Sequence, residues 1–220
     1  MDKFELGIAV QKVYDFIWDE FCDWYVETAK YRIYHKEEEK AAADCVLWVL
    51  KTVLKQALKL LHPFMPFITE EIYSVLVPEE ESLMMSEWPQ FHAEWDFPAE
   101  ENVMEHVKEI TRGIRNMRAE MNVPNNRKTK VYVVCEDTEI CDGISTLENS
   151  IKPLMMAEKI LVQQTKENIA DNAVSVVVPD AVVYLPLEDL VDFEQEMERL
   201  QKEEEKLKKR NQTSRGHALQ

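Results

Sequence analysis

The residues most suited to a specific chemistry in this sequence form a positively charged cluster between positions 112 and 130. Six basic side chains lie there against one acid, Glu120, in a chain whose formal net charge is −16. These six residues, here called the basic cluster, are Arg112, Arg115, Arg118, Arg127, Lys128 and Lys130. A solvated helix face usually mixes charges of both signs, so the one-sided cluster favours a surface that contacts phosphate groups.

A second group that could bind RNA ends the first helical stretch of the chain. Cations and aromatic rings follow one another there: Lys30, Tyr31, Arg32, Tyr34 and His35. In RNA complexes, Lys and Arg contact phosphates while aromatic rings stack on unpaired bases. A structural role also fits, because cations complement the negative end of the helix dipole and tyrosines can close the end of a bundle. Composition alone favours the structural role.

The motifs that many enzymes and cofactors need are absent from the sequence. Four glycines form neither a P-loop nor a G-x-G-x-x-G turn, and five histidines show no H-E-x-x-H spacing. The four cysteines, at positions 22, 45, 135 and 141, form no C-x-x-C pair, and no histidine completes a zinc site. We therefore predict no catalytic residue, metal site or cofactor in this chain.

Overall charge and cysteine usage narrow the class of protein. The negative net charge argues against a uniformly basic nucleic-acid binder and makes the basic cluster stand out. Scattered cysteines and the lack of an apolar signal region predict a reduced, cytoplasmic protein. No apolar run approaches the roughly 18 residues of a membrane helix, so we expect no membrane partner.

Helical periodicity organises the first 125 residues. Apolar positions recur every three or four residues over residues 6–34, 43–61, 66–77 and 102–121, which predicts four helices. Residues 78–98 are expected to form an irregular crossover. On the fourth helix, the side chains opposite the apolar stripe are Lys108, Arg112 and Arg115, with Arg118 at the edge of the stripe.

A sharp corner joins the second and third predicted helices. Pro63 disfavours helical dihedrals at His62, and Pro66 suits the first turn of a new helix. The corner is too apolar for an exposed turn, and we expect its side chains to be buried as the plug of a helical bundle. These side chains are Leu61, Phe64, Met65, Phe67 and Ile68.

After residue 126 the pattern becomes strand-like. Residues 130–135, 160–164, 174–178 and 181–185 predict strands, the last two forming a hairpin, and residues 146–158 predict a helix. The chain then shows steps of three and four, typical of a coiled-coil seam with one polar position at Glu204: Leu190, Phe193, Met197, Leu200, Glu204 and Leu207. The predicted fold is therefore mainly α, with a helical bundle over residues 1–125, a small α+β module over 126–186 and the start of a coiled-coil arm over 187–220.

Three stretches resemble a known family. They are residues 60–72 (Leu-Leu-His-Pro-Phe-Met-Pro-Phe-Ile-Thr-Glu-Glu-Ile), residues 5–27 and residues 114–124. Together they are similar to the anticodon-binding domain of class I aminoacyl-tRNA synthetases of the valine, isoleucine and leucine group, and to the valyl branch in particular. The resemblance covers about residues 3–210. The isoleucyl branch is the nearest rival, but it usually ends in a cysteine-rich zinc module.

The resemblance implies that the chain binds tRNA(Val) through the anticodon stem-loop. It implies a place at the anticodon for Trp24, Lys30 and Arg32. For the stem phosphates, the charge pattern predicts contacts from Lys108, Arg112, Arg115 and Arg118. In the valyl branch, residues from 187 onward would begin a helical hairpin, which the polar tail after Arg210 does not continue.

Members of the valyl branch join valine to tRNA with ATP and magnesium, in a catalytic domain accompanied by an editing domain. This chain lacks the His-Ile-Gly-His-like and Lys-Met-Ser-Lys-Ser-like motifs of the catalytic domain. The resemblance therefore implies an inactive fragment whose partners are those missing domains, and we expect a monomer. The main alternative is an acidic helical scaffold that dimerises through its C-terminal coiled coil, which leaves the basic cluster unexplained.

Overall fold

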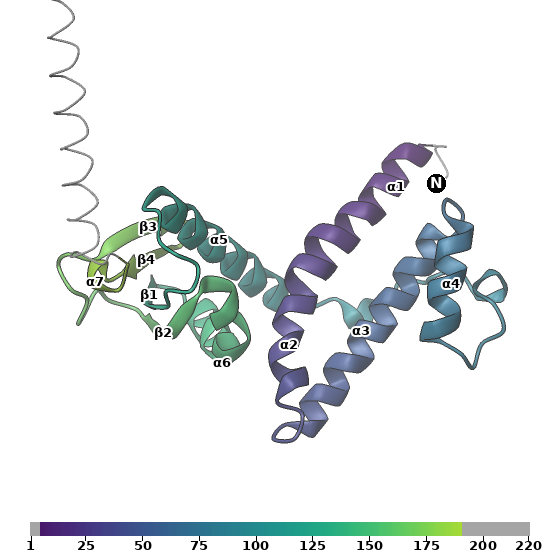
Figure 1. Cartoon of the computed structure of the whole chain (residues 1–220), viewed down its shortest axis with the longest axis horizontal. Coiled ribbons are helices and arrows are strands. Elements are labelled where there is room, and N and C mark those ends of the chain that lie inside the picture. Colours follow the sequence, from purple (N-terminus) through teal and green to yellow (C-terminus); the bar gives the residue numbers. More distant parts are fainter. Residues whose placement is uncertain (1–4, 191–220) are drawn as a thin grey trace, which may run out of the picture. The chain divides into compact units, whose positions relative to one another are not determined.

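The structure is a computed structural model, and it describes residues 5–190 (Figure 1). The chain forms two compact units. Unit 1 runs to Pro98 and includes Asn149–Ile151, and unit 2 contains Ala99–Glu148 and the chain from Lys152. The predicted mainly α class with a small α+β module is confirmed. The domain boundaries at residues 125 and 186 stay predictions, whereas the contacts divide the chain after Pro98, so that the fourth predicted helix belongs with the sheet.

Unit 1 is helical. Its first helix is continuous and comprises α1 (Leu6–Asp15), a π-helical segment η1 (Phe16–Val26) and α2 (Glu27–Tyr34). It is followed by α3 (Lys40–Leu61) and α4 (Pro66–Leu76), and short 3-10 turns occupy Leu83–Met85 and Ala93–Trp95. The three helices predicted in this part of the sequence are confirmed, although nothing in the sequence explains the π-helical geometry. Among residues 5–190, no helix has the length and apolar character needed to cross a membrane.

The corner between α3 and α4 lies where the prolines place it. The His62 N–H donates to the Leu58 carbonyl at 2.9 Å to close α3, and Pro66 opens α4. His62 Nδ1 lies 2.8 Å from Thr69 Oγ1, whose hydroxyl donates to the Met65 carbonyl at 2.8 Å. These contacts tie the end of one helix to the first turn of the next.

The predicted burial of the corner is wrong for most of its side chains. Phe67 is 90% exposed, and Met65 and Ile68 are each half exposed. Leu61 and Phe64 are intermediate. The reason is that α4 is apolar on two faces, and only the face that carries Thr69 and Tyr73 is packed. The sequence records both apolar faces but not which of them another element covers.

The core of unit 1 is a cluster of four buried residues from α3, α4 and the chain that follows: Leu58, Tyr73, Val77 and Leu83. A polar network borders this cluster, because the Glu80 carboxylate accepts hydrogen bonds from Lys55 and from the Tyr73 hydroxyl. The hydrogen bonds from Lys55 and Tyr73 lower the pKa of Glu80 below its ordinary value.

Unit 2 consists of a four-stranded sheet and its helices. In chain order these are α5 (Pro98–Glu120), β1 (Thr129–Cys135), α6 (Thr138–Met155), β2 (Ala157–Gln163), β3 (Val174–Val178), β4 (Ala181–Leu185) and the short α7 (Leu187–Leu190). The strand order is β2-β1-β4-β3, with β1 and β2 parallel and the other neighbours antiparallel.

The predicted strands and the hairpin are confirmed, and the helices begin earlier than predicted. Helix α6 starts at Thr138 rather than at residue 146, because Asp137 caps it by accepting the Glu139 N–H at 2.8 Å. Helix α5 starts at Pro98, four residues before the predicted start. Both starts carry recognised signals, a capping aspartate and an N-terminal proline, which helical periodicity alone does not use.

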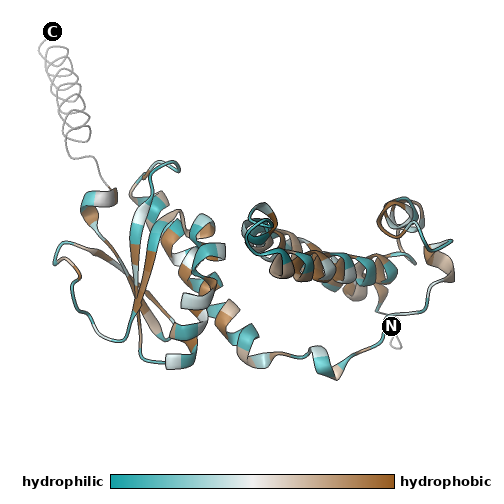
Figure 2. Ribbon diagram, turned by 90° about the horizontal axis from the view of Figure 1, so that it is seen from below, coloured by the Kyte–Doolittle hydropathy of each residue, from teal (hydrophilic) through white to brown (hydrophobic). Residues whose placement is uncertain are grey.

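Helices α5 and α6 lie on the same face of the sheet (Figure 2). A Cβ atom at Gly113 of α5 would stand 2.7 Å from Val176 Cγ1 of β3, so the helix backbone approaches the sheet closely. A Cβ atom at Gly143 of α6 would stand 2.7 Å from Val103 of α5. The side chains beneath the helices are fully buried, as Val131, Val133 and Val183 are.

Replacing a core residue of unit 1 should cost far more than replacing the exposed corner. We expect Leu58→Ala to lower the free energy of unfolding by about 2–5 kcal/mol, because a buried cavity replaces the side chain. Phe67→Ala should change it by less than about 0.5 kcal/mol. Urea unfolding followed by tryptophan fluorescence reports unit 1 alone, since all five tryptophans precede residue 98. Equal losses in the two variants would contradict the packing described for α4.

The Glu80 network should make the stability of unit 1 fall at acid pH. A carboxyl whose folded pKa lies below its unfolded value stabilises the fold above the unfolded pKa of about 4.3, and this contribution is lost as the pH falls through the folded pKa. The urea midpoint of the wild type should therefore drop more between pH 6.5 and pH 3.5 than that of Glu80→Gln. Glu71→Gln, at an exposed position of α4, is the matched control and should follow the wild type.

Candidate nucleic-acid interface

The C-terminal end of α2 combines cations with an exposed aromatic ring. Lys30 Nζ lies 2.5 Å from Glu27 Oε1, and Arg32 follows in the last turn of the helix. The Tyr31 ring stacks on His35, with 4.3 Å between ring centroids. Tyr34 is 77% exposed. This helix end can therefore offer charge to phosphates and a ring to an unpaired base.

Tyr34 is the residue that the sequence-based choice of Lys30 and Arg32 left out. It belongs to the same run of cations and aromatic rings, so the composition pointed to its neighbourhood. Its exposure, however, is a property of the folded helix end, beyond which the chain turns before α3 begins at Lys40. We therefore include Tyr34 in the α2 tip, defined as Lys30, Arg32 and Tyr34.

Trp24, chosen as an anticodon contact, is buried within unit 1. Only 8% of its surface is exposed, so its ring cannot stack on a base in this conformation. It lies in the π-helical segment together with Phe21, the other buried residue there. Both belong to the apolar stripe that predicts the first helix, and membership of that stripe was the signal that Trp24 packs in the core.

The predicted exposure of the cations of α5 is wrong for two of them. Lys108 and Arg118 are buried, with 5% and 3% of their surfaces exposed. Carboxylates three residues earlier on the helix pair with the cations. Lys108 Nζ lies 2.6 Å from Glu105 Oε1, and Arg112 Nη1 lies 2.6 Å from Glu109 Oε1. Glu105 and Glu109 lie before residue 112 and were therefore not counted with the basic cluster. In the fold, part of the positive charge of the cluster is neutralised by Glu109.

Arg118 and Arg115 serve the structure of unit 2. Arg118 Nη2 donates to the carbonyls of Pro124 at 3.0 Å and Arg127 at 2.7 Å, and so holds the turn between α5 and β1. Burial lowers the pKa of the Arg118 guanidinium. Arg115 Nε donates to the Leu154 carbonyl at 3.2 Å, which links α5 to the end of α6. Their assignment as phosphate contacts stays a prediction, and for Arg118 it would require the side chain to leave its carbonyl partners.

The chosen residues are divided between the two units. Trp24, Lys30 and Arg32 lie in unit 1, whereas the cations of α5 lie in unit 2. The basic cluster itself divides. Of its helical members, Arg118 is buried, whereas Arg112 and Arg115 are exposed and contact groups within unit 2. Lys128, just before β1, and Lys130 of β1 are exposed.

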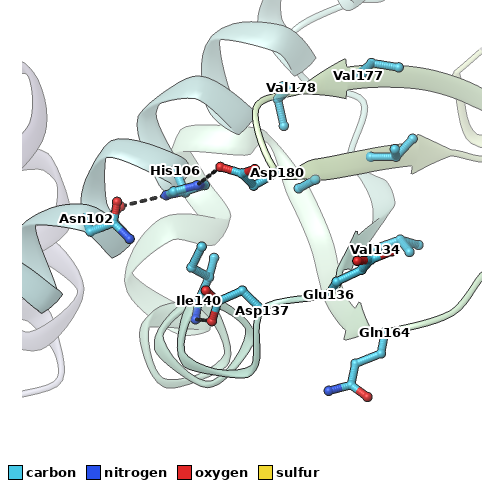
Figure 3. Close-up of a pocket in the computed structure, with 12 residues that line it drawn as sticks. Asn102, His106, Val134, Glu136, Asp137, Ile140, Gln164, Val177, Val178 and Asp180 are labelled. Carbon is cyan, nitrogen blue, oxygen red and sulfur yellow. Dashed lines mark hydrogen bonds and ion pairs between the residues drawn. The ribbon is translucent and has the colours of Figure 1, made fainter.

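A pocket of about 610 Å³ opens at one end of the sheet in unit 2 (Figure 3). His106 of α5 lies in it, with Nδ1 2.8 Å from the Asn102 carbonyl and Nε2 3.5 Å from Asp180 Oδ2. Glu136 and Asp137 add two further carboxylates to the lining. Three carboxylates would repel phosphate, so this pocket is not part of a surface for RNA.

The two free cysteines of unit 2 are buried within its fold. Cys135 and Cys141 are both buried, and the Cys141 thiol donates to the Cys135 carbonyl at 3.3 Å. Burial, together with the neighbouring Cys135, raises the pKa of Cys141 to about 11, which keeps the thiol protonated. Within residues 5–190, no group of three or more His, Cys, Asp or Glu side chains is placed to hold a metal ion.

The free energy of unfolding should distinguish the structural role of Arg118 from the exposed position of Arg112. Arg118→Ala should lower the free energy of unfolding of unit 2 by about 1–3 kcal/mol, because two carbonyls of the turn lose their donor. Arg112→Ala should change it by less than about 0.5 kcal/mol, since its ion pair is exposed. Urea unfolding followed by circular dichroism, with the tryptophan signal of unit 1 as reference, measures both. A loss in Arg118→Ala as small as that in Arg112→Ala would contradict the structural role.

Nearly the whole chain is similar in sequence to known proteins. The family described as the anticodon-binding domain of tRNA ligase matches residues 1–133. The chain is 46% identical over 207 residues to the valine–tRNA ligase of Clostridium perfringens, 41% identical over 207 residues to that of Carboxydothermus hydrogenoformans and 36% identical over 211 residues to that of Bacillus subtilis. Each alignment covers 94% of this chain but 23% of the relative, so the chain spans about a quarter of their length. The family match includes all of unit 1 up to Pro98, with the α2 tip, and the chain therefore belongs to the anticodon-binding domain family of tRNA ligases.

Proposed function

We propose that this chain is the part of a valine–tRNA ligase that grips the anticodon stem-loop of tRNA(Val). The observation that carries the proposal is its likeness to valine–tRNA ligases over 94% of its length. In the whole ligase the grip supports the attachment of valine to tRNA, which consumes ATP and needs magnesium. We place that chemistry in the remainder of the ligase, and the protein in the cytoplasm.

The α2 tip is the proposed contact with the anticodon loop. Two cations, Lys30 and Arg32, share the C-terminal end of α2 with the exposed ring of Tyr34. Unpaired bases present their faces and edges to such groups, while the phosphates between them meet the cations. Because the chain as a whole carries a charge of −16, attraction of RNA must be local and strongly dependent on salt.

The exposed apolar side chains of α4 support a place within a larger protein. Phe67, Ile68, Ile72 and Val75 are between 40% and 90% exposed and follow one another along the outer side of this helix. Exposed apolar surface of this kind usually marks an interface. We assign it to the catalytic and editing parts of the ligase, because the relatives are about four times as long as this chain.

The scaffold alternative has less support. Its coiled-coil seam lies outside the described residues, apart from Leu190. Leu190 is only 2% exposed within unit 2, so the first apolar position of the seam packs inside its own unit. We therefore propose a chain that is monomeric by itself.

The proposal can be tested with an anticodon stem-loop RNA from a valine-accepting tRNA and a copy with a scrambled anticodon. Fluorescence anisotropy at two salt concentrations should show tighter binding to the native loop. Arg32→Ala should weaken this binding and reduce the slope of log affinity against log salt by about 0.7–0.9, the contribution of one phosphate contact. Lys12→Ala, which removes an exposed cation of α1, is the matched control and should bind like the wild type.

Equal affinity for the two stem-loops would reject anticodon reading and leave non-specific attraction. A wild-type chain that binds neither RNA at low salt would reject the proposed function as a whole.

A further inference from the structure

The sheet of unit 2 has a second face, opposite the one that α5 and α6 cover (Figure 2). Side chains alternate between the two faces along each strand. On β1, exposed or intermediate residues alternate with the buried Thr129, Val131, Val133 and Cys135. The burial pattern of β4 alternates in the same way. We call this second face the open face.

Two tyrosines lie side by side at the centre of the open face. Tyr132 of β1 is paired with Tyr184 of β4 in the antiparallel register, and these are the two central strands of the sheet. Both rings are partly exposed. Lys166 Nζ lies 5.0 Å from the centroid of the Tyr184 ring, so a cation already occupies one face of this ring and a base stacking on that face would displace it.

Lysines border the tyrosines at the start of β1. Lys130 of β1 lies next to Lys159 of β2 in the parallel register, on the same face as Tyr132, and both are exposed. Lysine side chains at an exposed sheet edge of this kind can contact the phosphates of a bound strand. The exposed Lys128 adds a third cation just before the strand.

From this arrangement we propose that the open face is a second RNA-binding surface, which takes unpaired nucleotides of the same tRNA. Bases would stack on Tyr132 and Tyr184, and the phosphates joining them would lie at Lys130 and Lys159. Aromatic rings on the central strands of a four-stranded sheet are a recurrent way to bind single-stranded RNA. The identity of the RNA rests on the function proposed above, whereas the chemistry of the surface is independent of it.

The opposite end of the sheet sets a limit to this surface. Glu136 at the end of β1 and Asp180 in the β3–β4 turn line the acidic pocket there. A phosphate would be repelled at that end and attracted at the end that carries the lysines. The bound strand should therefore leave the sheet past Lys130 and Lys159 and not past Glu136.

Two RNAs separate this proposal from the proposed function. The first is a tRNA(Val) transcript, and the second is a seven-nucleotide uridine oligomer, which has no stem-loop. Replacing both tyrosines, Tyr132→Leu with Tyr184→Leu, should weaken binding of the oligomer by about 5- to 150-fold, the loss expected for one stacked base or more. Tyr132→Phe with Tyr184→Phe keeps the rings and should retain binding. Tyr14→Leu, at an exposed tyrosine of α1, is the control for loss of a ring elsewhere.

A further variant, Lys159→Ala, tests the surface without changing a residue packed in the sheet. Lys159→Ala changes an exposed side chain and should reduce the salt slope for the oligomer by about 0.7. Ultraviolet cross-linking of an oligomer that contains 4-thiouridine should attach it to the peptides around Tyr132 and Tyr184 in the wild-type chain.

Binding of tRNA without binding of the oligomer, and with no effect of the sheet variants on tRNA, would overturn this inference and leave the proposed function intact. Oligomer binding that depends on the tyrosines, in a chain with no preference for the native anticodon loop, would support the surface and reject anticodon reading. A wild-type dimer that the tyrosine-to-leucine changes convert to a monomer, measured by light scattering, would overturn the inference by making the open face a protein interface.

Discussion

The close approach of α5 to the sheet determines which charges unit 2 can offer to a partner. At Gly113 the helix backbone lies so near β3 that any side chain would meet Val176 and Val178. This contact fixes the rotation of α5 about its own axis. Once the rotation is fixed, Lys108 and Arg118 are buried and Arg115 reaches the end of α6. The cations that resemble a phosphate-binding stripe in the sequence are thereby committed largely to internal contacts.

That commitment explains how a chain of charge −16 can contain a basic cluster without a strongly basic helix face. Cations with a carboxylate one helical turn away, such as Arg112, contribute little net field at long range. Other cations gather at the ends of elements. Lys128, Lys130 and Lys159 lie together at one end of the sheet, and Lys30 and Arg32 lie at the end of α2. Positive charge available to RNA is therefore local in both units.

Elements could be predicted from the sequence because their signals are local. The prolines at positions 63 and 66 place the corner, and alternating β-branched residues place the β3–β4 hairpin. The late start predicted for α6 was avoidable, since Asp137 is a capping residue that is visible in the sequence. Trp24 was likewise recognisable as a core residue from its place on the apolar stripe.

Which side chains are buried could not be predicted from the sequence alone. An apolar residue such as Phe67 signals that something covers it, but the sequence does not say whether the cover belongs to this chain. The reverse holds for Arg118, whose buried position depends on the carbonyls of a turn that no periodicity describes. The open face was invisible for the same reason. Tyr132 and Tyr184 are 52 positions apart in the sequence, and only strand pairing makes them neighbours.

Two RNA-binding surfaces of low affinity on one chain can together bind one RNA with high affinity. Each unit offers partly exposed rings and a few cations, namely Tyr34 at the α2 tip and the paired Tyr132 and Tyr184 on the open face. If one tRNA reaches both, the second contact forms within the complex, at an effective concentration on the order of millimolar. Local contacts then suffice despite a repulsive net charge. Strong dependence on salt follows as well, because each phosphate contact contributes its own release of counterions.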